Sequence, residues 1–333
     1  MSKRVLITGA DGFIGSHLTE KLVRLGFNVR AFVMYNSFNT WGWLDSCPAD
    51  IKDQFEVVSG DIRDPFAVKK AIHSCDYVVH LAALIAIPYS YCAPHAYVDT
   101  NINGTLNILQ SCRDEGVERI IHTSTSEVYG SAQYLPIDEL HPLLGQSPYS
   151  ATKIGADQLA YSFYTSFNLP VVIARPFNTF GPRQSARAVI PTVIIQLLSG
   201  KNTIKLGHVS PTRDFNYVSD TVDAFIALMN SRAGLGEVFN FGSGYEISVE
   251  NLVFLVGGLM QTEVIIEADD IRIRPKNSEV RRLCSDISKI KKIIGWSPHV
   301  EGHEGLIMGL RKTIDWFSLK DNLKLYKPNI YNI

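Results

Sequence analysis

A tyrosine and a lysine four positions apart, Tyr149 and Lys153, are the residues of this sequence best suited to moving a proton. On a helix, side chains at this spacing project from one face and can meet at one substrate atom. A phenol has a pKa of about 10 and is a poor base at neutral pH, but a neighbouring ammonium stabilises the phenolate and lowers that pKa. The pair therefore predicts a base for a hydroxyl proton. Because the spacing recurs on many amphipathic helices, the preceding elements decide its meaning.

The N-terminal segment predicts an element that holds a cofactor. A short apolar run, residues 4–8, leads into the turn Gly9-Ala-Asp-Gly12-Phe-Ile-Gly15, and a segment with helical periodicity follows. Glycines let the backbone approach a pyrophosphate, whose charge is stabilised at the helix N-terminus. Strand, glycine turn and helix in this order indicate a dinucleotide site, and the alternative is a tight turn without a ligand. The expected cofactor contacts here are Gly9, Gly12, Phe13, Ile14 and Gly15.

Segments of strand and helix character then alternate along the chain. Strands are expected at 28–33, 55–59, 77–81, 118–123 and 170–174, and helices from Pro65, at about 94–115 and from Tyr149. Such alternation specifies a parallel sheet with helices on both faces. The predicted fold class is α/β, a Rossmann-like doubly wound parallel sheet.

The carboxyl ends of two of these strands should line the dinucleotide. Asp61 and Ile62 are placed to bracket the adenine, and Leu81, Ala82 and Ala83 to line the rest of the path. The alternatives are a helix cap for Asp61 and core packing for the other four.

The end of the second strand bears on the choice between NAD and NADP. Val33 and Met34 stand where a carboxylate usually accepts from the adenosine ribose, but residues 35–43 contain no cation for a 2′-phosphate. We expect NAD, because an unpaired phosphate costs more than a missing hydrogen bond, and NADP stays open. The aromatic residues between Tyr35 and Trp43 are expected to pack the loop, with covering of the cofactor as the alternative.

The composition excludes several classes of partner. Of 333 residues, 46% are hydrophobic and 20% are charged, which is ordinary for a globular protein of one or two domains. A net charge of -1 provides no broad basic field, so we expect neither nucleic acid nor an anionic membrane as a partner. An anionic ligand must then be held by local cations.

The cysteines and the N-terminus predict a cytoplasmic protein. Five cysteines contain no C-x-x-C motif and are odd in number, which fits reduced thiols. The apolar run that ends at Gly9 is too short for a signal sequence, and no apolar stretch approaches the length of a membrane span. His299 and His303 have helical metal-ligand spacing, but their neighbours supply no third ligand, so we expect a loop, a helix start and no metal.

Thr123-Ser-Thr-Ser-Glu127 stands at the end of a predicted strand, about two dozen residues before Tyr149. With the N-terminal glycine turn, this layout resembles the extended branch of the short-chain dehydrogenase/reductase superfamily, which acts on nucleotide-activated sugars. The resemblance covers nearly the whole chain. It implies that Thr123, Tyr149 and Lys153 contact the cofactor and that Thr125 hydrogen-bonds the reacting hydroxyl.

The element Arg175-Pro-Phe-Asn178-Thr-Phe-Gly-Pro resembles the one that leads into the substrate lobe in that branch. We expect a dinucleotide-binding domain over residues 1–175, with later segments contributing, and a smaller interleaved C-terminal substrate lobe mainly over 176–333. Arg213 and Arg274 match positions that grip the substrate diphosphate, although a surface salt bridge is the alternative for any arginine. The expected substrate contacts are Ile85, Asn178, Arg187, Val189, Arg213 and Arg274.

Glu127 is the residue that bears on the outcome of the reaction. Once Tyr149 has taken the C4 hydroxyl proton and hydride has left C4, the C5 proton is acidic, and a carboxylate can remove it while the C6 hydroxyl leaves as water. Return of the hydride to C6 gives a 4-keto-6-deoxy sugar without net redox change. The run Thr125-Ser126-Glu127, with serine in the middle, resembles the corresponding run of GDP-mannose 4,6-dehydratases. In those enzymes the glutamate serves as both base and acid. The same Thr-Ser-Glu run also occurs in UDP-glucuronate decarboxylases, so it leaves both reactions open.

Longer stretches resemble NAD-dependent 4,6-dehydratases that act on nucleotide-linked N-acetylglucosamine in bacterial surface-sugar pathways such as legionaminic acid. They include residues 35–44, 83–91, 176–191 and the C-terminal segment from Tyr326. Residues 84–88 should face the hexose C5 and C6 and contain no cation, which favours a hydroxymethyl group over a carboxylate unless an arginine reaches in.

The predicted function is therefore 4,6-dehydration of UDP- or GDP-N-acetylglucosamine. A decarboxylase, a 4-epimerase and a catalytically silent NAD-binding sensor remain as alternatives. In the family, the helices at about 101–115 and 149–167 pair across a dimer, so the resemblance also implies a homodimer.

Overall fold

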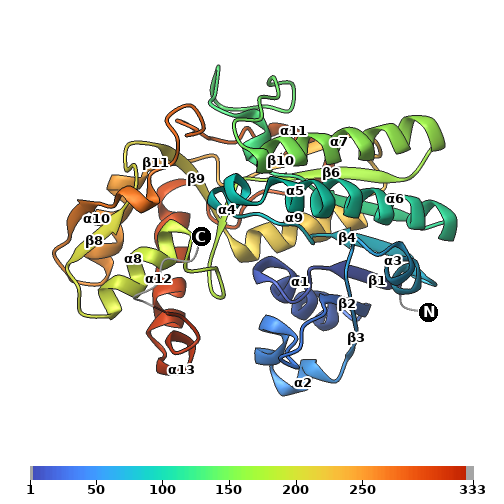
Figure 1. Ribbon diagram of the computed structural model, residues 1–333, viewed down its shortest axis with the longest axis horizontal. Helices are drawn as coiled ribbons and strands as arrows, with labels where there is room; N and C mark the ends of the chain where they lie inside the picture. The colour runs from blue at the N-terminus through green and yellow to red at the C-terminus, as the bar shows by residue number, and fades with distance from the viewer. Residues whose placement is uncertain (1–2, 328–333) are drawn as a thin grey trace.

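A seven-stranded, entirely parallel sheet forms the centre of the computed structural model, which describes residues 3–327 (Figure 1). The strand order is β10-β6-β5-β4-β1-β2-β3, so the direction of winding reverses between β1 and β4. In such sheets, ligands bind in the crevice outside the carboxyl ends of the strands at the reversal. The strands are β1 (Arg4–Thr8), β2 (Asn28–Met34), β3 (Phe55–Gly60), β4 (Tyr77–His80), β5 (Arg119–Thr123), β6 (Val171–Pro176) and β10 (Val238–Phe241).

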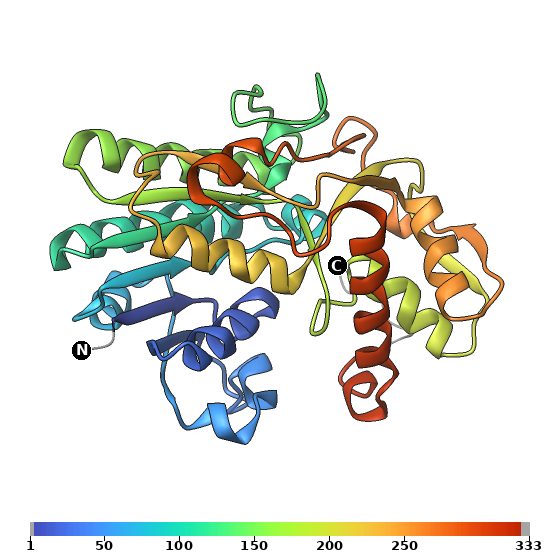
Figure 2. The same ribbon diagram turned by 180° about the vertical axis from the view of Figure 1, so that it is seen from behind.

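Helices cover both faces of this sheet, which is why its inner strands are continuous buried runs of valine, isoleucine and leucine. Figures 1 and 2 show the two faces from opposite sides. One face is covered by α3 (Pro65–Ile72), α6 (Gly104–Glu115) and α7 (Pro148–Phe167), and the other by α1 (Phe13–Arg24) and α9 (Val218–Asn230). The predicted doubly wound α/β fold is confirmed.

The helix expected at 94–115 is one helical segment with a wide turn inside it. It consists of α5 (Pro94–Tyr97), a π-helical stretch Val98–Asn103 and α6. The side chain of Asn101, in the wide turn, accepts from the Leu84 N–H (2.9 Å) and donates to the Leu84 carbonyl (3.0 Å) and to the Thr152 hydroxyl (3.1 Å). The π-helical stretch therefore ties the segment after β4 to α7, the helix that carries Tyr149.

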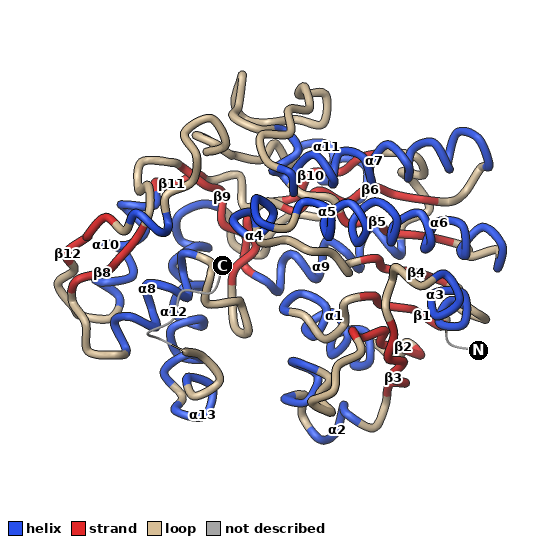
Figure 3. Tube along the Cα trace, viewed as in Figure 1, coloured by secondary structure: helices blue, strands red, loops and turns tan. Residues whose placement is uncertain are grey.

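A smaller lobe lies beside the carboxyl edge of the sheet (Figure 3). It has two small sheets, of order β11-β9-β7 and β12-β8, and its own hydrophobic core. Its elements are β7 (Asn178–Phe180), α8 (Val189–Leu198), β8 (Thr203–Leu206), β9 (Thr212–Tyr217), β11 (Glu246–Ser248), α10 (Val249–Leu259), β12 (Ile265–Ala268), α12 (Gly302–Ser318) and α13 (Lys320–Leu323). Between β9 and β11 the chain returns to the large sheet as α9 and β10.

Several elements were not expected from the sequence because they are short or lack periodicity. They are the 3₁₀ turns Gly42–Ser46, Ser126–Tyr129 and Asp270–Arg272, α2 (Ala49–Lys52), α4 (Ile87–Cys92), α11 (Ser288–Ile294) and the lobe strands β7, β8, β11 and β12. The sequence predicts the last long helix over about residues 305–317, and α12 begins three residues earlier, at Gly302, so His303 is helical. The sequence also predicts that the tail from Leu325 packs against the body, and residues 328–333 of that tail lie outside the described residues. Within residues 3–327, every helix is too short or too polar to traverse a bilayer.

Candidate active site

The start of α7 places Tyr149 and Lys153 at the edge of the sheet. Ser147 and Ser150 form a reciprocal capping box, and Pro148 occupies the first turn, so the sequence fixes the residue at which the helix begins. Tyr149 and Lys153 then lie one turn apart, and both are buried. The helix thus presents a phenol and an ammonium on one face, as the spacing predicted.

The Lys153 ammonium donates to the backbone carbonyl of Thr123, at the end of β5, over 2.5 Å. Burial lowers the pKa of Lys153 to about 8, and the Asp157 carboxylate opposes that change. Burial also raises the pKa of Tyr149 well above that of a free phenol, with a hydrogen bond from Thr125 acting in the opposite direction. In this state of the protein the Lys153 ammonium is directed to a carbonyl, and desolvation dominates the pKa of the phenol. The expected lowering of that pKa by Lys153 stays a prediction.

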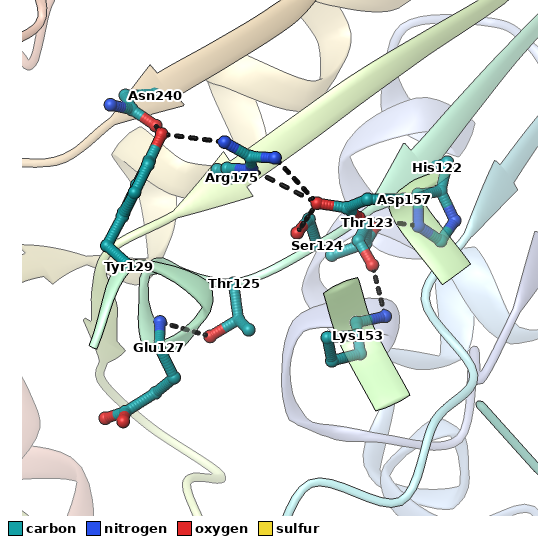
Figure 4. A network of polar contacts seen from close by, with 10 residues as sticks. All are labelled: His122, Thr123, Ser124, Thr125, Glu127, Tyr129, Lys153, Asp157, Arg175 and Asn240. Carbon is teal, nitrogen blue, oxygen red and sulfur yellow. Dashed lines mark hydrogen bonds and ion pairs between the residues drawn. The ribbon is translucent and has the colours of Figure 1, made fainter. Parts of the chain in front are cut away.

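The segment after β5 exposes alternate side chains to the site. Thr125 caps the 3₁₀ turn Ser126–Tyr129 by accepting from the Glu127 N–H at 3.3 Å. Thr125 and Glu127 are partly exposed, whereas Ser124 and Ser126 are 3% exposed and face inward. Figure 4 shows the Glu127 carboxylate directed away from the buried polar groups. Of the predicted catalytic set, Ser126 is thus the member whose side chain is withdrawn from the site.

The glycine turn between β1 and α1 is compact enough to require its glycines. Gly9 has φ of +68°, and a Cβ there would lie 2.9 Å from the Ala82 nitrogen. A Cβ at Gly15 would lie 2.1 Å from the Gly9 carbonyl oxygen. Gly12 precedes α1, which has neither a side-chain cap nor an acidic residue in its first turn. The turn therefore leaves helix N–H groups for an anion, which fits a dinucleotide pyrophosphate.

Phe13 and Ile14 begin α1 and pack partly buried against the core, and Leu81 and Ala82 follow β4 directly beside the turn. The N–H groups of Leu81 and Ala82 both donate to the Thr8 hydroxyl over 3.1 Å. The structure therefore brings the two predicted segments of the dinucleotide path together at the point where the strand order reverses.

At the other end of this crevice, Asp61 lies in a hollow of about 450 Å³ with Arg63, Asp64, Asp99 and Asn103. Asp64, not Asp61, caps α3. Asp61 pairs with Arg63, and their hydrogen bond lowers the pKa of Asp61. Asp61 thus lines the hollow while it is paired with Arg63, whereas Ile62 is 5% exposed and packs in the core.

The aromatic residues in the segment after β2 differ in their burial. Trp43 packs against Trp316 of α12, with ring centroids 5.7 Å apart, and against Tyr326 at 5.9 Å. Tyr35 and Phe38, by contrast, are 70% and 85% exposed. The expected packing role holds for Trp43, which joins the N-terminal segment to the lobe.

A second hollow, of about 240 Å³, lies beside α7. It is lined by Ala83, Leu84, Ile85, Ala86, Tyr89, Tyr97 and Arg187. Arg187 comes from the loop before α8, which begins at Val189, and brings a cation to the segment that contains none of its own. Arg187 is therefore the arginine that could hold a carboxylate there, and residues 84–88 by themselves no longer favour a hydroxymethyl group.

The predicted diphosphate-binding arginines converge on one carboxylate. Arg213 Nη2 lies 3.1 Å, and Arg274 Nη1 3.6 Å, from Oε1 of Glu279. Asn178, at the start of β7, has a buried Oδ1 without a hydrogen-bond partner among the described residues. The two arginines and the amide lie in or next to the lobe that faces the sheet edge.

His299 and His303 do not form a metal pair. His303 contacts the Tyr245 hydroxyl at 3.3 Å, while His299 bonds through Nδ1 to Asp220 and lies 3.7 Å from Asp223. Ligand atoms of Asp220, Asp223 and His299 lie within 4.8 Å of one another, a grouping that neighbours in the sequence did not reveal. The direct hydrogen bond explains their proximity without an ion.

The sequence of this chain matches one known protein family over most of its length. Residues 6–308 match the model of the family described as GDP-mannose 4,6 dehydratase. The chain belongs to this family. It is an enzyme of the extended short-chain dehydrogenase/reductase type, as its motifs predicted.

Curated relatives of this dehydratase-family enzyme differ in reaction. A putative UDP-glucose 4-epimerase of Methanocaldococcus jannaschii is 30% identical over 96% of the chain and 99% of the relative. The dTDP-D-glucose 4,6-dehydratase of Mus musculus is 30% identical over 95% and 89% of the two chains. UDP-glucuronic acid decarboxylase 1 of Xenopus tropicalis is 32% identical over 95% and 72%. All three outcomes of C4 oxidation thus occur among the relatives.

Solved structures of two other enzymes resemble this chain over nearly its whole length. DesIV, a dTDP-glucose 4,6-dehydratase of Streptomyces venezuelae solved with NAD bound, has a TM-score of 0.86 and 28% identity over 98% of this chain and 99% of its own. A UDP-N-acetylglucosamine 4-epimerase of Methanobrevibacter ruminantium has a TM-score of 0.83 and 29% identity over 95% and 98%. The fold expected from the sequence is shared by both.

Three residues of the site were not predicted. Tyr97 stacks edge-on against Tyr149, with centroids 6.2 Å apart, and Glu279 neutralises the two arginines. Asp157 lies beneath Lys153 and binds the segment after β5. Of these, only Asp157 has a local signal, since it follows Lys153 by four positions on the same helix.

Proposed function

We propose that this enzyme catalyses NAD-dependent 4,6-dehydration of a nucleotide-activated hexose, with UDP- or GDP-N-acetylglucosamine as the substrate. The observation that carries the proposal is the joint presentation of Tyr149, Thr125 and Glu127 beyond the carboxyl end of β5, the strand next to β4. Residues 1–175, joined by later segments, serve as the dinucleotide-binding domain, and residues 176–333 mainly as the substrate lobe.

The residues present fit a dinucleotide. Gly9 and Gly15 permit a turn that a Cβ would obstruct, and Thr123, Asp61, Leu81 and Ala82 border the crevice. NAD bound there supplies a reversible acceptor for the hydride of C4. We infer NAD rather than NADP because Arg63 is already engaged by Asp61 and Met34 ends β2.

The chain's own groups then perform the proton transfers. Tyr149 takes the C4 hydroxyl proton, and the Thr125 hydroxyl orients that oxygen. Lys153 supplies the positive charge that stabilises the phenolate as it forms. Glu127 removes the C5 proton and passes a proton to the departing C6 hydroxyl, which leaves as water. C5 takes up a proton from solvent when the hydride is returned to C6. Epimerisation at C4 needs no base at C5, so the partly exposed Glu127 favours dehydration.

A specific observation supports decarboxylation as a second candidate. Arg187 lines the hollow beside residues 83–86, where it could pair with the C6 carboxylate of a hexuronic acid. If the substrate is instead an N-acetylglucosamine nucleotide, the Arg187 guanidinium binds neutral hydroxyl groups or the N-acetyl oxygen.

The test is incubation with NAD and, separately, UDP-N-acetylglucosamine, GDP-N-acetylglucosamine, UDP-glucose and UDP-glucuronate, followed by NMR of the products. We expect a 4-keto-6-deoxy sugar from an N-acetylglucosamine nucleotide. A pentose from the glucuronate establishes the decarboxylase, and a C4 epimer establishes the epimerase. If no substrate reacts and none reduces bound NAD, the alternative of a silent NAD-binding protein is favoured.

We also propose a homodimer formed through α6 and α7. Leu106, Tyr161 and Phe167 on these helices are 38%, 49% and 45% exposed, an apolar surface that a second copy could cover. Sedimentation of the protein should give twice the monomer mass, and a Leu106→Glu, Tyr161→Glu double variant should give the monomer.

A further inference from the structure

A buried network lies directly beneath the proposed catalytic residues, and the reaction described above uses none of its charges (Figure 4). At its centre is Asp157, which is 1% exposed and follows Lys153 by one turn of α7. Tyr149, Lys153 and Asp157 thus form one stripe on the helix. We call Asp157 and its partners His122, Ser124, Arg175, Tyr129 and Asn240 the Asp157 network.

Asp157 binds the end of β5 through two side chains. The Ser124 hydroxyl donates to Asp157 Oδ2 over 2.6 Å, and His122 Nε2 lies 3.1 Å from Oδ1. Burial lowers the pKa of His122, so the ring is neutral and donates through Nε2. Among the described residues, nothing hydrogen-bonds to His122 Nδ1, so Asp157 is the polar group that orients the ring.

Arg175 extends the network to the far end of the catalytic segment. Its Nε and Nη2 donate to Asp157 Oδ2 over 3.2 and 2.9 Å, and its Nη1 donates to the Tyr129 hydroxyl over 3.0 Å. The Tyr129 hydroxyl in turn donates to Asn240 Oδ1 over 2.7 Å. Ser124 and Tyr129 lie on either side of Thr125 and Glu127, so one buried ion pair holds both ends of the segment that carries them.

We propose that Asp157 is a positioning residue of the reaction, which fixes Thr125 and Glu127 relative to Tyr149 and keeps Lys153 positively charged. Through Ser124 and Arg175 it joins β5, β6 and α7 at the sheet edge. Its negative charge lies one helical turn from the Lys153 ammonium. The nucleotide hexose does not need to touch it.

Stability alone does not account for such a pair. Removing two charges from water is costly, and well-packed apolar residues often replace a buried ion pair without loss of stability. What apolar residues cannot supply is a fixed geometry with four directed hydrogen bonds to one carboxylate. The network therefore has the properties expected of a positioning device.

The charges around Asp157 are consistent with this role. Burial alone would raise the pKa of Asp157, but hydrogen bonds from His122 and Ser124 and the charge of Arg175 hold it below its usual range. Asp157 is the group that opposes the lowering of the Lys153 pKa by burial. Tyr149 also faces Asp157, which disfavours the phenolate slightly. Loss of the Asp157 charge should therefore let Lys153 lose its proton at lower pH.

The decisive variant is Asp157→Asn, which keeps the size of the side chain and removes its charge. Its kinetic arm rests on the proposed function, because it follows turnover of a nucleotide hexose. We expect kcat to fall by about tenfold to a hundredfold with KM changed less than about threefold. The alkaline limb of the pH profile should move to lower pH by about one unit. An unchanged limb in a folded, active variant overturns the inference.

A second measurement needs no substrate. NMR of the protein isotope-labelled at lysine Cε gives the pKa of Lys153, and Lys153→Met assigns its resonance. A lower Lys153 pKa in Asp157→Asn supports the inference, and an equal pKa overturns it. If the wild-type enzyme converts no nucleotide hexose, the proposed function fails, while this titration still decides the role of Asp157.

Ser124→Ala separates position from charge and remains informative if Asp157→Asn does not fold. It removes one hydrogen bond to Asp157 and leaves the carboxylate in place. We expect kcat to fall about three- to tenfold with an unshifted alkaline limb. The matched control is Asp220→Asn, in which a buried carboxylate loses a histidine partner, His299, without change in the pH profile. Unchanged kcat in folded Ser124→Ala, or a shifted limb in the control, overturns the inference.

Discussion

Arg213, 7% exposed, donates from Nη2 to Glu279 Oε1 over 3.1 Å. Burial lowers the pKa of Arg213, while Glu127 and Glu279 act in the opposite direction. The cation expected to bind the substrate diphosphate therefore already has an anionic partner. A diphosphate that binds Arg213 must compete with this carboxylate or share the arginine with it.

Replacement of Glu279 tests that competition. In Glu279→Gln the amide keeps the shape of the side chain but not its charge, so Arg213 and Arg274 should bind a nucleoside diphosphate about three- to tenfold more tightly. Calorimetric titration with UDP and GDP measures the change. Glu246→Gln is the matched control, because Glu246 pairs with Arg282 and the Thr212 hydroxyl instead. Weaker binding in Glu279→Gln would mean that the carboxylate itself contacts the ligand.

The carboxylate of Glu127 can be separated from C4 chemistry. We expect Glu127→Gln to lose at least about a hundredfold in dehydration while C4 oxidation persists, because the amide cannot accept the C5 proton. NMR in deuterated water detects exchange at C5 in the wild-type enzyme, and that exchange should disappear. Retained exchange in Glu127→Gln assigns the base to another group.

The depressed pKa of Lys153 predicts opposite pH trends for stability and activity. Since the folded-state pKa is about 8 and the ordinary pKa of a lysine is 10.5, the unfolded chain binds more protons than the native protein between these limits. Stability should thus rise with pH across this window, by on the order of 1 kcal/mol per unit from this group. Activity should fall, because Lys153 loses its charge.

Urea unfolding at pH 8 and pH 9.5 measures this slope in the wild-type enzyme and in Lys153→Met. We expect the variant to have the less positive slope, because it carries no titrating group at this position. Identical slopes would show that Lys153 remains charged throughout the range. The raised pKa of Tyr149 acts only at higher pH, since its folded-state value exceeds that of a free phenol.

The glycine turn should not tolerate a single methyl group. A Cβ at Gly15 would lie 2.1 Å from the Gly9 carbonyl oxygen, so Gly15→Ala must displace backbone and should cost about 1–3 kcal/mol of stability and most of the NAD affinity. Tryptophan fluorescence quenching on titration with NADH measures the affinity. Gly258→Ala, in α10, meets no atom within 4 Å and should bind NADH as the wild type does.

Roles set by local pattern could be predicted from the sequence. The turn at Gly9, the capped helix that presents Tyr149, and the buried parallel strands all depend on residues close together in the chain. The partners of these groups could not be predicted. Lys153 bonds to a carbonyl 30 positions away, and Arg213 pairs with a carboxylate 66 positions away. Such pairings depend on how strands and lobe pack.

The hollow beside α7 is a second place where residues distant in the sequence come together. Residues 84–88 indicated an apolar surface, but Arg187, about a hundred positions later, supplies a cation to it. Trp43 likewise packs against Trp316 of the last long helix. The residue pattern of one segment predicts the surface that this segment forms, but it does not predict which side chains from distant segments will pack against that surface.

The return of the chain to the large sheet after β9 limits how the smaller lobe can be exchanged between relatives. β10 hydrogen-bonds along the open edge of β6, from Val238 opposite Ile173 to Phe241 opposite Pro176. A chimera joined once, at residue 175, would therefore pair an edge strand and α9 from one parent with a sheet from the other. To keep the sheet intact, a chimera needs two segments from the donor of the lobe, one that ends before residue 218 and one that begins after residue 241. A donor lobe must therefore be supplied as two inserts, and its halves must fit each other across a stretch that belongs to the large sheet and its helices.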